Sequence, residues 1–132
     1  MAASIGLLAT SPAKAYDTPT AIANLADDMA ACAAYYTIVS TVSEESGRTD
    51  SKWKAAAKAS KTSALHAMQM LEVLMEGQPP EYARSKLLLH TQIESKALAN
   101  EGFDGLLFQY SDMCKSLMED PDSRMHYWLE KK

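Results

Sequence analysis

The 132-residue chain is poor in glycine, proline and cysteine, with 5 Gly, 5 Pro and 2 Cys. It contains no Cys-x-x-Cys pair, which argues against a catalytic thiol pair and a covalently attached haem. No run approaches the roughly 20 apolar residues that a membrane-spanning helix needs. The net charge of −4 argues against general nucleic-acid binding. The composition therefore predicts neither a transmembrane span nor a nucleic-acid partner.

The sequence motifs of common catalytic sites are also missing. There is no glycine-rich phosphate loop, no nucleophile elbow and no His-Glu-x-x-His metal motif. The Glu-x-x-His pairs that bind two iron ions in helix bundles are absent as well. We therefore expect the protein not to be an enzyme and to hold no resident cofactor.

The chain is rich in residues that favour helices, with much Ala, Leu, Met, Lys and Glu. Residues 19–46 carry apolar side chains at alternating steps of three and four, which predicts one buried helical stripe. Thr18 suits the N-cap of this helix, Pro19 its first position and Gly47 its end. The predicted stripe consists of Ile22, Leu25, Met29, Cys32, Tyr36 and Val39.

Further helices are predicted over residues 51–76, 80–100 and 105–119, with a short helical turn after Pro121. The short connections imply an all-α, up-down antiparallel four-helix bundle with a short extra C-terminal helix, formed by residues 16–132 as one domain. The predicted inner face of residues 51–76 consists of Trp53, Ala57, Ser60, Ala64, Met68, Leu71 and Met75. That of residues 80–100 consists of Tyr82, Leu89 and Ile93, and that of residues 105–119 consists of Leu107, Tyr110, Met113, Cys114 and Leu117. In the last helical turn, Met125 and Trp128 are predicted to pack back on the bundle.

Residues 1–15 resemble the apolar region and cleavage site of a secretory signal peptide. Ala13 and Ala15 form a small-x-small triplet before Tyr16, although no basic residue precedes the apolar run. We therefore predict an exported protein, periplasmic or secreted, that is cut after Ala15. The alternatives are a cytoplasmic protein whose first residues form a docked or disordered segment, and an uncleaved anchor at a membrane surface.

The two cysteines are predicted to face each other. At about 1.5 Å per residue, Cys32 and Cys114 fall within one helical turn in height on neighbouring helices. In an oxidising compartment they would form a disulfide that closes a loop of about 80 residues and contributes about 4 kcal/mol. In the cytosol they would remain two buried thiols.

Charged side chains are predicted to be ordinary surface groups. Asp27 and Asp28 fall on the predicted solvent side of their helix. Lys54, Lys58 and Lys61 share one helix face, for which a solvated patch near Glu44 and Glu45 is favoured over an anion-binding site.

Surplus apolar residues on the second and third helices suggest contact with another molecule. The favoured function is therefore a non-enzymatic bundle that binds a protein partner or forms a homo-oligomer, through Met70, Val73, Leu74, Leu87 and Leu88. The alternative is a ligand- or metal-binding bundle, for which the candidates are His66, Met70, His90 and Glu94.

Overall fold

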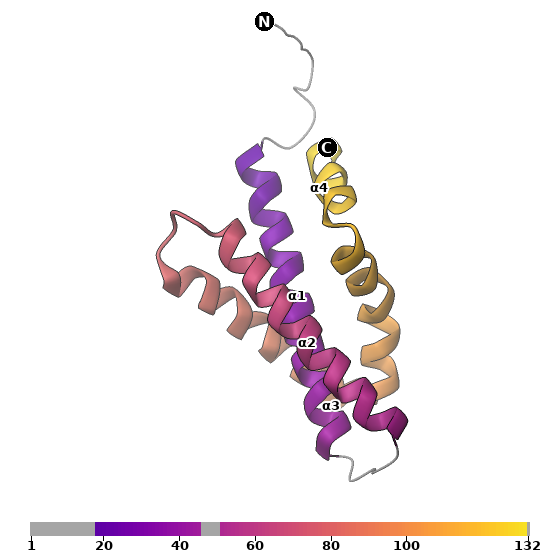
Figure 1. The fold of residues 1–132 in the computed structure, drawn as a ribbon. Coiled ribbons are helices and arrows are strands. Elements are labelled where there is room, and N and C mark those ends of the chain that lie inside the picture. The colour runs from indigo at the N-terminus through magenta and orange to yellow at the C-terminus, as the bar shows by residue number, and fades with distance from the viewer. Residues whose placement is uncertain (1–17, 46–50, 132) are drawn as a thin grey trace, which may run out of the picture.

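The computed structural model describes residues 18–45 and 51–131, and this part of the chain is almost entirely helical. Its four helices are α1 (Thr18–Glu45), α2 (Ser51–Leu74), α3 (Pro80–Glu119) and α4 (Pro121–Glu130). They pack as an all-α bundle, and the described residues contain no strand (Figure 1). The predicted fold class is confirmed. The predicted signal peptide and its cleavage site lie outside the described residues.

Gly102 divides α3 into two segments, residues 80–101 and 103–119. Its φ of 82° lies in the left-handed region, where a glycine has no steric penalty. The two segments point in different directions, and the second runs beside α1 toward α4 (Figure 1). The two segments correspond to the predicted third and fourth helices. However, the second begins at residue 103, two positions before the predicted start at residue 105.

Helix α1 is the centre of the bundle and contacts α2, α3 and α4. The predicted stripe is largely confirmed: Leu25, Met29, Cys32 and Val39 are buried, and the other two positions are half-buried. The prediction of a single stripe is nevertheless wrong, because α1 has neighbours around most of its circumference. Alanines outside the stripe allow those neighbours to approach closely, and six of them are buried, namely Ala21, Ala26, Ala30, Ala31, Ala33 and Ala34.

The predicted inner faces of α2 and of the second α3 segment are confirmed. In α2, Ala57, Ala64 and Leu71 are buried, and the larger residues of the predicted face are half-buried. In the second α3 segment, Cys114 and Leu117 are buried. The last helix packs back on the core through Met125 and Trp128, as predicted.

The predicted inner face of the first α3 segment is wrong. Tyr82, Leu89 and Ile93 are exposed, and the segment turns other side chains toward the core. The run of three leucines at 87–89 presents apolar groups to both faces, so helical periodicity alone could not select one. Small residues suit the closely packed alanines of α1, and the observed inner face comprises Ala83, Leu87, Glu94, Ala97 and Leu98.

Candidate functional site

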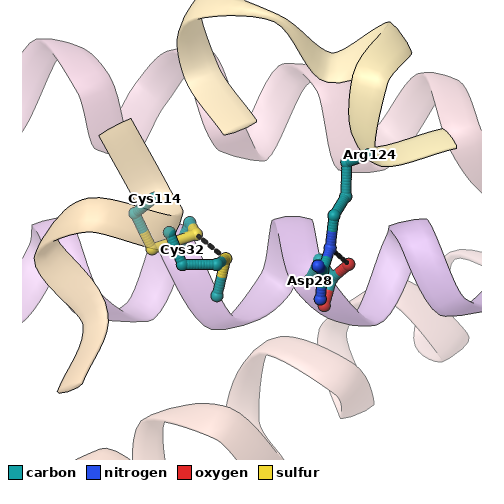
Figure 2. Close-up of a disulfide and its surroundings, with 5 residues drawn as sticks. Asp28, Cys32, Cys114 and Arg124 are labelled. Carbon is teal, nitrogen blue, oxygen red and sulfur yellow. Dashed lines mark hydrogen bonds and ion pairs between the residues drawn. A yellow bond between two sulfur atoms is a disulfide. The ribbon is translucent and has the colours of Figure 1, made fainter. Parts of the chain in front are cut away.

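The disulfide pair lies at the middle of the core. Cys32 on α1 and Cys114 on α3 are both fully buried, with their Cα atoms 5.4 Å apart and their sulfurs bonded (Figure 2). The predicted facing of the two cysteines is confirmed. The Sδ of Met113 lies 3.7 Å from the Cys32 Sγ, a packing contact, because a disulfide sulfur carries no proton to donate. The pair is compatible with an oxidising compartment.

Asp28 links α1 to α4 through hydrogen bonds, and it lies one helical turn before Cys32 on α1. Its Oδ2 accepts a hydrogen bond from Arg124 Nε at 2.7 Å (Figure 2). The same oxygen accepts a hydrogen bond from Trp128 Nε1 at 2.6 Å. The guanidinium also lies over the ring of Tyr127, 4.3 Å from its centroid. The prediction that Asp28 faces solvent is wrong, because α4 covers this side of α1.

Asp27 makes the corresponding polar contact with the first α3 segment. Its Oδ1 accepts a hydrogen bond from Lys86 Nζ at 2.8 Å, and His90 Nε2 lies 3.7 Å from the same oxygen. The Asp27 side chain keeps 45% of its surface exposed, against 14% for Asp28. The two adjacent aspartates thus hold different helices, and Asp28 is the better shielded of the two.

Glu94 is a carboxyl group buried without a hydrogen-bond partner among the described residues. Burial in this apolar setting raises its pKa to about 8, from an ordinary value of 4.5. The side chains of Tyr35 and Tyr110 lie nearby, and their rings stack with centroids 5.9 Å apart. Their own burial, together with the nearby Glu94 carboxyl, raises their pKa values. At neutral pH the carboxyl is therefore mostly protonated, a state the sequence did not indicate.

An apolar groove of about 470 Å³ runs between α1, α2 and α4. It contains three of the predicted interaction residues, Met70, Val73 and Leu74. Its other walls are built from the start of α1 and the start of α4, together with His66 of α2. The surplus apolar residues of α2 therefore line a concave surface. The lining from the other helices includes Ile22, Leu25, Pro121 and Met125.

The exposed side of residues 80–101 forms a second apolar surface, which we call the outer face of α3. Leu88 is 59% exposed and Leu89 is 53% exposed. Leu87, by contrast, is half-buried and packs against the core, so it does not belong to this face. The remaining large apolar members of the outer face are Tyr82 and Ile93.

The metal-ligand candidates do not gather at one point. His66 and Met70 line the groove, whereas His90 lies beside Asp27 and Glu94 is enclosed in the core. Among the described residues, no three His, Cys, Asp or Glu side chains are grouped as metal ligands. The described part of the chain thus offers an apolar groove and an apolar helix face rather than a coordination site.

The lysine patch of α2 borders a hollow between α1 and α2. Lys54, Lys58 and Lys61 are exposed, and Glu44 of α1 lines the same hollow. This matches the predicted solvated face near an acidic residue.

Comparison with known protein families, characterised proteins and solved structures finds no match to this chain. Within the described ranges, no helix is both long enough and apolar enough to cross a bilayer.

Proposed function

We propose that this protein is a small, exported, non-enzymatic helical bundle that acts by binding protein, either another chain or a second copy of itself. The observation that carries the proposal is the outer face of α3, where neighbouring leucines are more than half exposed. A helix of a soluble bundle usually directs such residues inward. Contiguous exposed apolar surface is characteristic of binding sites.

Export is supported by the cysteine pair and by the chain's first residues. A buried disulfide persists in oxidising compartments, and the small-x-small triplet at Ala13–Ala15 suits a leader peptidase. Expression with an upstream start codon, followed by sequencing of the mature N-terminus, tests this part. Export with a first residue of Tyr16 is expected, and an exported chain that begins elsewhere contradicts the cleavage site.

The binding function is tested by changing the outer face without touching the core. Leu88→Ser is expected to weaken self-association, or retention of a cross-linked partner protein, while the helical circular dichroism spectrum stays unchanged. Leu65→Ser is the matched control, because Leu65 of α2 is 56% exposed and belongs to neither apolar surface. Equal binding by both variants and the parent would contradict a binding role for the outer face.

A second candidate function is the binding of an apolar ligand in the groove between α1, α2 and α4. Its support is the groove volume of about 470 Å³ together with a mostly apolar lining. Titration with a fluorescent apolar probe tests it. Met70→Glu is expected to abolish probe binding, and unaltered binding by this variant would place the probe elsewhere.

A further inference from the structure

On the outer face of α3, polar residues flank the exposed leucines in a regular arrangement along the helix. At 3.6 residues per turn, Ser85, Leu88, Leu89 and Gln92 point in similar directions, away from α1. Two leucines thus form the centre of the face, and one small or uncharged polar residue flanks them on each side. An apolar centre with a polar margin is the usual composition of a protein–protein contact surface.

Charges of opposite sign stand at equal distances from this centre. Glu81 precedes Leu88 by seven positions, and Lys96 follows Leu89 by seven positions. Both are exposed, and both lie on the outer side of the helix. The stretch between them measures about 22 Å at 1.5 Å per residue.

This arrangement is self-complementary under a two-fold rotation. If a second copy is turned antiparallel about an axis between Leu88 and Leu89, each residue meets the one that lies equally far on the other side of the centre. Leu88 then meets Leu89 of the second copy, and Ser85 meets Gln92. At the two ends, Glu81 of each copy meets Lys96 of the other. An isologous contact of this kind is the commonest form of dimer interface.

We propose that two copies of this chain associate through the first segment of α3, packed antiparallel about a two-fold axis at Leu88 and Leu89, with Glu81 of each copy facing Lys96 of the other. The inference rests on the proposed function and specifies its partner. A parallel pairing brings Glu81 against Glu81 and Lys96 against Lys96, so the charges select the antiparallel register.

Charge reversal provides the test, carried out on the mature chain with its cysteines intact. Glu81→Lys is expected to weaken homodimerisation about tenfold, because it sets two lysines against each other at both ends of the contact. Lys96→Glu is expected to do the same with two glutamates. A mixture of the two variants should form a heterodimer, and the double variant E81K/K96E should recover the homodimer. Native mass spectrometry and sedimentation measure all four species.

Two outcomes would overturn the proposed dimer. One is a parent chain that stays monomeric at the highest soluble concentration. The other is dimerisation that neither Glu81→Lys nor Lys96→Glu weakens. If Leu88→Ser nevertheless lowers binding to a different, cross-linked protein while Leu65→Ser does not, the outer face binds a heterologous partner. In that case the proposed function stands and the self-association inference fails.

Discussion

The two segments of α3 contact the same central helix in different ways. The second segment, together with α4, is joined to α1 by a disulfide, by the buried Leu106 and Leu117, and by the shielded hydrogen bonds of Asp28. The first segment packs through small and half-buried residues and pairs with the more exposed Asp27. It encloses the Glu94 carboxyl, which has no hydrogen-bond partner within residues 18–45 and 51–131. It also leaves its largest apolar side chains outside.

The two segments place their apolar residues differently. The second segment directs most of them inward, where they add to the stability of the bundle, although its Phe108 is 93% exposed. The first segment keeps them at the surface, where they contribute to stability only when another molecule covers them. The glycine at position 102, with its φ of 82°, allows one helix-forming stretch to take up both arrangements.

Removing the disulfide should have the largest effect of the changes considered. For a sequence separation of 82 residues, the chain-entropy model gives about 4.5 kcal/mol of stabilisation. The variant C32A/C114A should therefore unfold at a much lower urea concentration than the parent. Intact mass without reductant should also show the parent two hydrogens lighter than its reduced form. A variant with the parent's urea midpoint would show that the second segment does not depend on the bond.

The buried carboxyl of Glu94 should make the stability of the parent fall as the pH rises. Between about pH 4.5 and about pH 8 the folded chain keeps this proton and the unfolded chain releases it. The free energy of unfolding should then decrease by up to about 1.4 kcal/mol per pH unit, and level off outside this window. The titratable groups beside Glu94 are Tyr35 of α1 and Tyr110 of the second α3 segment, and burial raises their pKa values further above 10.

Urea unfolding over this pH range checks the prediction. Glu94→Gln should remove the slope, whereas Glu72→Gln, a change at an exposed position of α2, should keep it. Equal slopes in the parent and in Glu94→Gln would mean that the Glu94 carboxyl does not titrate in this window.

Substitution of Asp28 and Asp27 compares how strongly α4 and the first α3 segment are held to α1. Asp28→Ala removes the carboxylate that accepts hydrogen bonds from the Trp128 indole nitrogen and the Arg124 guanidinium, and should cost about 2 kcal/mol. Asp27→Ala removes a more exposed pair with Lys86 and should cost less than about 1 kcal/mol. Thermal unfolding measures both. The reverse order of costs would contradict the view that α4 is held more firmly than the first α3 segment.

The smallest effect on stability is expected on the outer face of α3. In a dilute solution of monomers, Leu88→Ser should change the free energy of unfolding by less than about 0.5 kcal/mol, because the side chain is 59% exposed. Leu71→Ser, which alters a buried leucine of α2, should cost several kcal/mol and serves as the contrast. A large loss for Leu88→Ser would mean that the outer face supports the monomer fold.

Most of the bundle could be predicted from the spacing of apolar residues and from the Gly and Pro residues that interrupt helices. The helix bounds, the division near Gly102 and the height of Cys32 relative to Cys114 all follow from spacing along the chain. Such features are local, or depend on counting residues along helices of known rise. The inner face of α2 was equally predictable, because its apolar positions form one stripe.

The orientation of the first α3 segment could not be predicted in this way. Apolar residues occur on both of its sides, and the choice between them depends on what α1 offers as a surface. The small alanines of α1 and the carboxylate of Asp27 favour a side that carries Ala83, Leu87 and Lys86. The burial of Glu94 follows from that choice, so only a correct orientation of the segment could have revealed it.

The amino-acid sequence alone is enough to predict that this protein is helical, where its chain turns, and that its two cysteines can meet. These properties depend on backbone preferences and on the fixed rise of a helix. The side of the first α3 segment that became the core depended on tertiary packing, because the shape and charge of the surface that α1 presents to this segment favour one of its two apolar sides. This orientation leaves Leu88 and Leu89 outside, while the predicted Cys32–Cys114 pair lies at the centre of the bundle.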